Sequence, residues 1–304
     1  MSWVATLLRE NCIVQTCDTF AMNALKAWPL EARQRITGVF TDIDDTLTTD
    51  GAITADALAA LGALKSAGLQ TIAITGRPVG WSEPFARAWP VDAVVAENGA
   101  LALFYKKGAV SHQFTHTKYL QRPEYGRGLL SKIYQQDDAA RAANYVRAQK
   151  VAQRVLREVP GAALAQDSAG RETDIAVDHS EFVHLPAARI AQVVAIMQSE
   201  GMNATVSSIH INGWYGAHDK LEGARWIVSQ LLGRNLNAEL EQWVFVGDST
   251  NDQLMFEAFQ NSVGVANVRR FEAQLSHKPR YITQGERGAG FAEVVAALLA
   301  ARVA

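Results

Sequence analysis

The chain has 304 residues, and its 48% hydrophobic and 20% charged fractions are typical of a globular protein with one large domain or two. A formal net charge of −2 provides no overall basic surface, so we predict neither a nucleic-acid partner nor a membrane-surface partner. No stretch approaches the roughly 20 apolar residues of a membrane span, so we predict no transmembrane helix.

Residues 1–35 carry no motif, and we expect them to form an N-terminal extension with one or two short helices. Both cysteines, Cys12 and Cys17, lie in this stretch, and their spacing fits no zinc pattern. Arg9 and Glu10 interrupt the region that would be apolar in a signal peptide. We therefore expect reduced thiols and a cytoplasmic location.

A regular alternation of short apolar runs and helical patterns begins at Ile36. Thr54 is suited to cap the first helix, and Gly68 is suited to end it. We expect strands at 38–40, 71–76 and 92–100, and helices at 54–69 and 81–89. Short buried strands that alternate with helices predict a doubly wound parallel sheet, which is an α/β fold.

The alternation breaks after about Tyr105 and resumes after about residue 210. Between these points we expect a strand at 109–115, helices as far as Val159, strands at 162–166 and 173–178, a helix at 186–200 and strands within 203–215. The order β-α-β-β-α-β predicts that residues 109–210 form an inserted α+β domain.

The last third of the chain returns to the α/β pattern. We expect helices at 219–233, 251–259 and 291–303, and strands at 243–248 and 262–268. One core domain would then comprise residues 36–108 and 211–304.

Four acidic residues follow two of the predicted strands. Asp42 and Asp44 end the first strand and point to the same side, because side chains alternate along a strand. Asp248 ends a later strand, and Asp252 lies one helical turn beyond it. The carboxyl ends of parallel strands line a common crevice, where four acids would repel one another without a cation. An oxygen-rich set of this kind is typical of a Mg²⁺ site.

Groups suited to bind an anion accompany these acids. Thr75 and Gly76 end a third strand and offer a hydroxyl and a backbone N–H to phosphate oxygens. Lys220 opens a helix, where its ammonium and the helix N-terminus both favour an anion. Together with the acids, these groups predict phosphoryl transfer.

Four motifs along the chain carry a resemblance to a known family. They are DIDDT (42–46), the TGR that contains Thr75, Lys220, and GDSTND (247–252). In this order they resemble the motifs of the haloacid dehalogenase superfamily of phosphatases. ENGA (97–100) and VGVANV (263–268) are similar to its subfamily IIB, which includes Cof-type, sucrose-phosphatase-like and mannosyl-3-phosphoglycerate phosphatase-like proteins. In that subfamily a large α+β cap is inserted between the second and third motifs.

The resemblance implies a mechanism and a substrate class. It implies that Asp42 is the nucleophile and forms an aspartyl-phosphate, and that Asp44 is the general acid and base. It implies Mg²⁺ held by Asp42, Asp44, Asp248 and Asp252, and phosphate held by Thr75, Gly76, Lys220 and Asn251. The expected partner is a small phosphorylated metabolite, with a sugar or polyol phosphate ahead of other monoesters.

Several alternatives stay open at this point. A phosphomutase of the phosphomannomutase type would use the same residues, and a non-catalytic phospho-ligand sensor could keep the fold. Arg77 fits either a structural ion pair or a phosphate contact, and His210 and His218 fit either structural roles or positions beside the site. The segment from Arg171 to His179 fits either a leaving-group site or an exposed polar strand face. The oligomeric state is not predicted.

Overall fold

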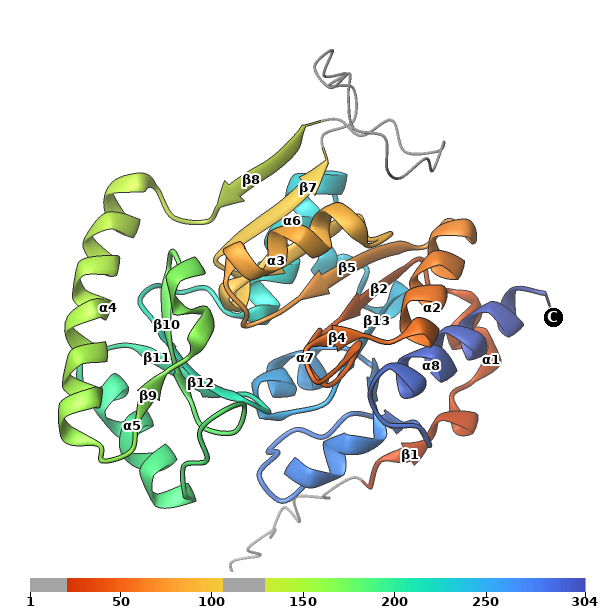
Figure 1. Cartoon of the computed structure of the whole chain (residues 1–304). Helices are drawn as coiled ribbons and strands as arrows, with labels where there is room; N and C mark the ends of the chain where they lie inside the picture. Colours follow the sequence, from red (N-terminus) through yellow and green to blue (C-terminus); the bar gives the residue numbers. More distant parts are fainter. Residues whose placement is uncertain (1–20, 106–128, 304) are drawn as a thin grey trace, which may run out of the picture.

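The computed structural model describes residues 21–105 and 129–303, which form a large sheet, a smaller sheet and one short hairpin (Figure 1). The large sheet has the strand order β1-β15-β14-β13-β2-β5-β6-β7-β8. Neighbouring strands are parallel except in the pairs β6–β7 and β7–β8. In this order the strands are Asn23–Ala24, Tyr281–Ile282, Asn261–Gly264, Trp243–Gly247, Gly38–Thr41, Gln70–Ile74, Ala93–Ala96, Leu101–Tyr105 and Leu130–Tyr134.

Helices cover both faces of the large sheet because its central strands are apolar on both faces. Along β2, Val39 faces the cluster that α2 and α8 cover, and Phe40 faces the cluster under α6 and α7. The first face carries α1 (Leu30–Gln34), α2 (Ala55–Ser66), α3 (Val79–Ala88) and α8 (Arg287–Arg302), and the second carries α6 (Lys220–Leu232) and α7 (Gln253–Ala258). As predicted, Thr54 caps α2 and Gly68 follows its end with a positive φ of 73°.

The smaller sheet is antiparallel and has the order β11-β12-β10-β9. Two helices pack their apolar residues against it and form a separate buried cluster. The elements are β9 (Ala163–Leu164), β10 (Asp174–Asp178), β11 (Asn203–Val206), β12 (His210–Trp214), α4 (Asp138–Glu158) and α5 (Ala187–Ser199). The predicted fold class, a doubly wound α/β core with an inserted α+β cap, is therefore confirmed.

Three predicted elements differ in the structure. Residues 130–134, which were expected to be helical, form β8, because they pair with the exposed edge of β7. The strand expected at 262–268 ends at Gly264, and Ala266–Phe271 is a 3₁₀ turn that fits only because no side chain at Gly264 meets Val268. The helix expected at 251–259 is split into a 3₁₀ turn (Thr250–Asp252) and α7.

The strand pairing differs from the predicted domain boundaries at two strands, β8 and β12. Strand β8 lies inside the range 109–210 but belongs to the large sheet, and β12 extends beyond 210 within the smaller sheet. Within the predicted extension 1–35, β1 pairs with β15 at the sheet edge and Trp28 is buried against Tyr281. The strand expected at 109–115 and both cysteines lie outside the described residues.

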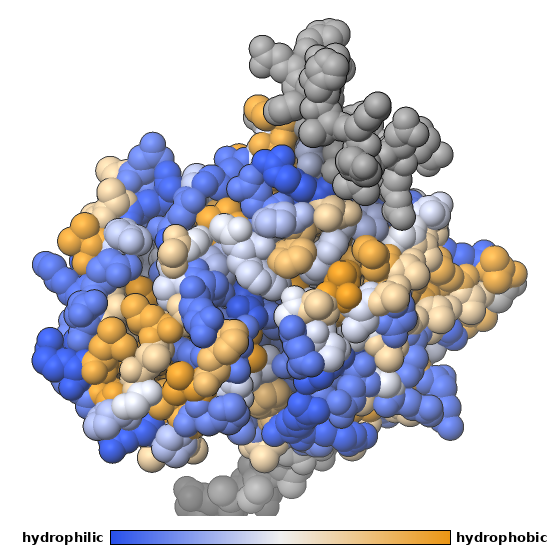
Figure 2. Space-filling model, in the orientation of Figure 1, coloured by the Kyte–Doolittle hydropathy of each residue, from blue (hydrophilic) through white to orange (hydrophobic). Residues whose placement is uncertain are grey.

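The surface in the orientation of Figure 1 is mostly hydrophilic, with smaller apolar patches between the polar residues (Figure 2). A short hairpin, β3 (Thr48–Thr49) with β4 (Ala52–Ile53), follows the first acidic motif. Among residues 21–105 and 129–303, no helix combines the length and the apolar character needed to cross a bilayer.

Candidate active site

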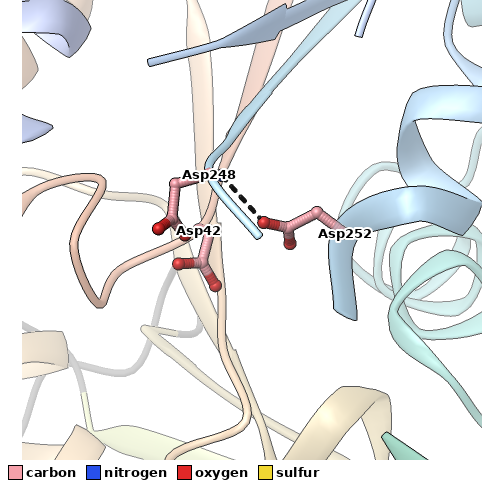
Figure 3. Close-up of side chains that lie close together, drawn as sticks. All are labelled: Asp42, Asp248 and Asp252. Carbon is pink, nitrogen blue, oxygen red and sulfur yellow. Dashed lines mark hydrogen bonds between the residues drawn. The ribbon is translucent and has the colours of Figure 1, made fainter. Parts of the chain in front are cut away.

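The ends of two neighbouring strands bring the first and fourth motifs together. Asp42 follows β2 and Asp248 follows β13, and these strands pair directly in parallel. Asp252 comes from the 3₁₀ turn after β13. One carboxylate oxygen from each of the three residues lies within 4.8 Å of the others, and all three side chains are buried (Figure 3). The structure thus brings together three of the four predicted acidic residues, whereas Asp44 contacts Thr75 and Arg77.

Lys220 is the first residue of α6, and its side chain reaches this cluster. Its Nζ donates to Asp42 Oδ1 at 2.5 Å and to Asp252 Oδ1 at 2.7 Å. Burial raises the pKa of Asp42 to about 8 even though the Lys220 charge opposes that shift. Burial alone would lower the pKa of Lys220, but the charges of Asp252 and Asp42 raise it. The cluster therefore has one ammonium for three carboxyl groups, and it would carry an excess of negative charge if all three were ionised.

The hydrogen bonds of Asp252 show that it orients the loop after β13. Its Oδ2 accepts the backbone N–H groups of Asp248, at 3.0 Å, and Ser249, at 3.2 Å. Gly247 makes this possible, because a Cβ there would lie 2.5 Å from Asp252 Oδ2. With Oδ1 bonded to Lys220, both oxygens of Asp252 already have donors.

Asp248 differs from Asp252 in that one of its oxygens has no donor. Asn267 donates to Asp248 Oδ2 at 2.9 Å, whereas the buried Oδ1 has no hydrogen-bond partner among the described residues. Burial raises the pKa of Asp248 well above its ordinary value. A buried carboxylate oxygen without a donor is costly unless a cation satisfies it. The cluster therefore fits a hard divalent cation bound by Asp42 and Asp248.

The second motif lies beside Asp44. Thr75 follows β5, and its hydroxyl accepts the backbone N–H of Arg77 at 3.0 Å and lies 3.5 Å from Asp44 Oδ2. The Arg77 Nε donates to Asp44 Oδ1 at 2.9 Å. Thr75 does not cap α3, because Pro78 occupies the cap position.

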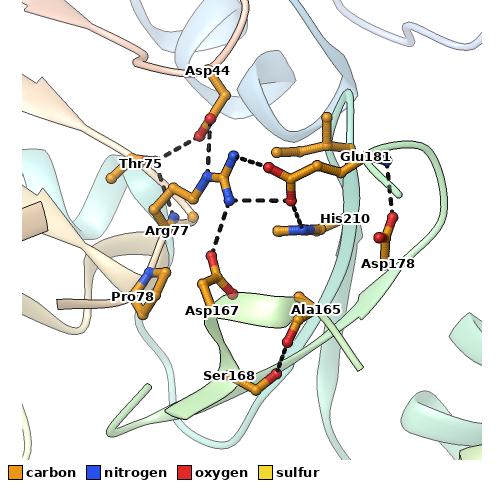
Figure 4. Close-up of polar contacts among 12 residues, drawn as sticks. Asp44, Thr75, Arg77, Pro78, Ala165, Asp167, Ser168, Asp178, Glu181 and His210 are labelled. Atoms are coloured by element: carbon orange, nitrogen blue, oxygen red, sulfur yellow. Dashed lines mark hydrogen bonds and ion pairs between the residues drawn. The ribbon is translucent and has the colours of Figure 1, made fainter. Parts of the chain in front are cut away.

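Arg77 also reaches the inserted cap (Figure 4). Its guanidinium donates to Asp167 at 3.1 Å and to Glu181 at 2.7 Å, and Glu181 in turn lies 2.8 Å from His210 Nε2. Burial raises the pKa of Glu181, but the hydrogen bonds from His210 and Arg77 outweigh it and lower the pKa to about 2. Of the two roles considered for Arg77, the structure shows the ion pairs, and these pairs connect Asp44 to the cap.

A small pocket lies between the strand ends and the β11–β12 turn. Asn251 and Gly76, both predicted to hold phosphate, lie in its wall, whereas Thr75 is not among the lining residues. The lining consists of Asp42, Asp44, Gly76, Arg77, Ser249 and Asn251 from the large domain, and Ser207, Ser208, Ile209, His210 and Asn212 from the cap. The cap residues that face this pocket therefore come from the β11–β12 turn and the start of β12.

Some polar residues occupy positions that local patterns did not indicate. His218 does not line the pocket and stacks on Trp214. Arg171 and Asp174 form a buried ion pair, so the segment from Arg171 to His179 is neither an exposed strand face nor part of the pocket lining. Nothing in the sequence pattern singled out Asp167 and Glu181, because neither lies in a strand or an α-helix.

The acidic cluster, its lysine and the cap-covered pocket lie at the strand ends of a doubly wound α/β fold, and this arrangement suits phosphoryl transfer. Residues 39–125 match the family model of haloacid dehalogenase-like hydrolases. A comparison with curated proteins gives no match. The match covers less than a third of the chain, and this stretch is similar to haloacid dehalogenase-like hydrolases, in agreement with the resemblance seen in the motifs.

Three solved structures illustrate the likeness of fold. A Thermoplasma acidophilum protein has a TM-score of 0.62 at 14% identity, over 87% of this chain and 98% of that one. The sucrose-phosphatase of Synechocystis, solved with sucrose and phosphate, has a TM-score of 0.57 at 14% identity with the same coverage. The C-terminal domain of a C. albicans trehalose-6-phosphate phosphatase has a TM-score of 0.61 at 13% identity, over 94% of this chain and 100% of that one.

Proposed function

We propose that the chain is a Mg²⁺-dependent phosphatase that hydrolyses a small phosphate monoester through an aspartyl-phosphate on Asp42. The observation that carries this proposal is the environment of Asp42. Its carboxylate lines the pocket, Lys220 holds one of its oxygens, and the donor-free oxygen of Asp248 lies in the same cluster. A nucleophilic carboxylate needs such neighbours, since a positive charge beside it favours its ionised form and stabilises the charge of the phosphoryl group.

The reaction would proceed in two displacements at phosphorus. An Asp42 oxygen attacks, the bond to the leaving oxygen breaks, and Asp44 donates a proton to that oxygen. Water then attacks the phosphorus of the aspartyl-phosphate, Asp44 accepts a proton from the water, and the Asp42 carboxylate is released. Lys220, Thr75, the Gly76 N–H and the Asn251 amide would hold the phosphoryl oxygens.

The acidic cluster would hold Mg²⁺ through the Asp42 and Asp248 carboxylates and the Asp44 backbone carbonyl. Asp252, whose oxygens already have donors, would act directly or through the residues it orients. Bound Mg²⁺ would neutralise charge on the transferring phosphoryl group.

We place a sugar or polyol phosphate first among substrates. The pocket wall from the cap carries the hydroxyls of Ser207 and Ser208 and the amide of Asn212, which suit a leaving group rich in hydroxyls. Two of the similar structures are named as phosphatases of sugar phosphates. We propose that the cap, predicted within residues 109–210 and extended by β12 to include Asn212, selects this group, while the rest of residues 36–108 and 211–304 performs the chemistry.

Replacing the nucleophile tests the reaction directly. Asp42→Asn should lower the turnover of an aryl phosphate with Mg²⁺ by about 10³-fold or more, because an amide cannot form the acyl-phosphate. Steady-state kinetics measure the loss, and circular dichroism checks the fold. Asp50→Asn, at a turn outside the pocket, is the matched control and should keep full activity. Normal turnover by Asp42→Asn would refute the nucleophile.

The substrate class requires a separate experiment. A hydrolysis screen over phosphorylated sugars, polyols and other metabolites, with Asp42→Asn as the blank, should show sugar or polyol phosphates as the best substrates. A preference of about tenfold or more for other esters would overturn this choice. Adding a sugar bisphosphate separates the phosphomutase alternative, since only a mutase would depend on it.

A further inference from the structure

The motif ENGA (97–100) lies next to the pocket but has no part in the proposed chemistry. Its first residues form a 3₁₀ turn, Glu97–Gly99, directly after β6. Glu97 and Asn98 both have positive φ, at 49° and 54°, a backbone conformation that is strained for residues other than glycine. Such strain persists only where surrounding contacts fix the backbone, so the contacts of Glu97 are informative.

The carboxylate of Glu97 is fully buried and binds groups from both domains. From the cap, the backbone N–H of Thr173 donates to Oε2 at 2.6 Å, the Thr173 hydroxyl donates at 2.5 Å, and the N–H of Glu172 donates to Oε1 at 3.0 Å. From the core, the N–H of Val79 donates to Oε1 at 3.1 Å. The charge is held by polar groups of two segments that are far apart in the sequence.

The backbone around Glu97 is bonded to the loop of the second motif, residues 75–77, which we call the phosphate loop. The N–H of Glu97 donates to Arg77 O, and the N–H of Asn98 donates to Thr75 O, each at 3.0 Å. The turn Glu97–Gly99 therefore binds the phosphate loop through its backbone N–H groups, and it binds the cap through the Glu97 side chain.

The cap residues 170–173, which we call the docking segment, contact the core along their whole length. Gly170 packs against Gly80 so closely that a Cβ on Gly80 would lie 2.9 Å from the Gly170 Cα. Next, Arg171 donates to Gly76 O at 3.0 Å, and a second cap residue, Asn212, donates to the same carbonyl at 3.2 Å. The docking segment thus reaches the phosphate loop directly and also through Glu97.

We propose that Glu97 is a positioning residue that keeps the phosphate loop in its binding geometry only while the docking segment is bound. This inference rests on the proposed function, because it assigns the loop to phosphate. The donors from Glu172 and Thr173 hold the Glu97 carboxylate, and the turn that carries it holds Thr75 and Arg77. Loss of the carboxylate should therefore disturb phosphate binding as well as the junction between the domains.

The test compares Glu97→Gln with the wild type in the full-length chain. The amide keeps the size but turns an NH₂ group toward backbone N–H donors. We expect kcat for an aryl phosphate to fall about tenfold or more and the inhibition constant of inorganic phosphate to rise about fivefold or more. We also expect faster amide hydrogen exchange at both Val79 and Thr173. Values of kcat and the inhibition constant within about twofold of wild type, with only a lower Tm, would overturn the proposal.

Two further variants keep the test decisive. Thr173→Val removes one donor to Glu97 and should shift both constants in the same direction by about twofold to fivefold. If neither constant moves in this variant, the coupling is refuted even if Glu97→Gln fails to fold. Tyr215→Phe removes a hydrogen bond within the cap, to Glu200 O, and should leave both constants unchanged.

The exchange measurement separates this inference from the proposed function. It needs no turnover, so it reports on the Glu97 contacts whether or not the wild type hydrolyses the ester. Unchanged exchange at Val79 and Thr173 in Glu97→Gln refutes the coupling. A wild type without Mg²⁺-dependent hydrolysis refutes the proposed phosphatase activity instead.

Discussion

Two sites in this fold hold buried carboxylates, and they stabilise them in different ways. In the acidic cluster, Lys220 pairs with two of the three aspartates, and Oδ1 of the third, Asp248, has no donor among the described residues. At the domain junction, Glu97 has polar donors on both oxygens and no ion pair within the described part of the chain. The first arrangement leaves room for a cation, and the second leaves none.

The difference separates chemistry from positioning. A carboxylate that lacks donors gains most from a metal ion or from a reacting phosphoryl group. A carboxylate whose oxygens are filled by N–H and O–H groups fixes backbone segments instead. We expect the acidic cluster to respond to changes of charge and metal, and the junction to respond to changes of hydrogen-bond pattern.

The largest effect on stability should come from the single cation of the acidic cluster. Lys220→Met leaves the carboxylates of Asp42 and Asp252 buried without a positive partner, which we expect to lower the free energy of unfolding by about 3–5 kcal/mol. Urea denaturation without Mg²⁺ measures this loss. Lys65→Met breaks a partly exposed pair with Asp92 and should cost about 1 kcal/mol or less. Equal losses in the two variants would contradict the comparison.

An effect of intermediate size should be the stabilisation by Mg²⁺, which we expect to depend on the acidic cluster and not on Glu97. Mg²⁺ at about 100 times its Kd should stabilise the wild type by about 2.7 kcal/mol, which thermal unfolding shows as a rise in Tm. Asp248→Asn should abolish this rise, because it alters the oxygen that lacks a donor. Glu97→Gln should keep the rise relative to its own baseline. A full response in Asp248→Asn would place the cation elsewhere.

The smallest effect should come from His218, which lies in the loop between β12 and α6 and stacks on Trp214. Neither ring nitrogen has a hydrogen-bond partner among the described residues, and burial lowers the pKa of His218 to about 4. As the pH falls below about 6.5, His218 takes up a proton in the unfolded chain, whereas in the folded chain it stays neutral down to about pH 4. The free energy of unfolding therefore declines across that range. Between pH 7 and pH 5 we expect this group to contribute a loss of about 1–2 kcal/mol.

Urea denaturation at both pH values tests this prediction against two variants. His218→Asn should lose less stability than the wild type over the same interval. His277→Asn changes an exposed histidine and should keep the wild-type dependence. The prediction is wrong if His218→Asn shows the same decline as the wild type.

Much of the core could be predicted because its signals are local. An apolar run that ends in an acid, as at Asp42 and Asp248, predicts both a buried strand and the place where its side chain meets the crevice. The strand at 130–134 was missed because nothing in its own sequence shows that the edge of β7 lies beside it. The early end of β14 at Gly264 depends in the same way on how Val268 packs over it.

The sequence by itself determined the class of fold and the order of the motifs that supply Asp42, Thr75, Lys220 and Asp248. Each of these residues is positioned by the end of one strand or the start of one helix. Only the tertiary structure decided the partners of Arg77 and Glu97. Their contacts join residues up to 104 positions apart, with Glu181 and with Thr173. Hydrogen bonds between distant segments leave no periodic pattern in the chain, because they depend on where the cap docks.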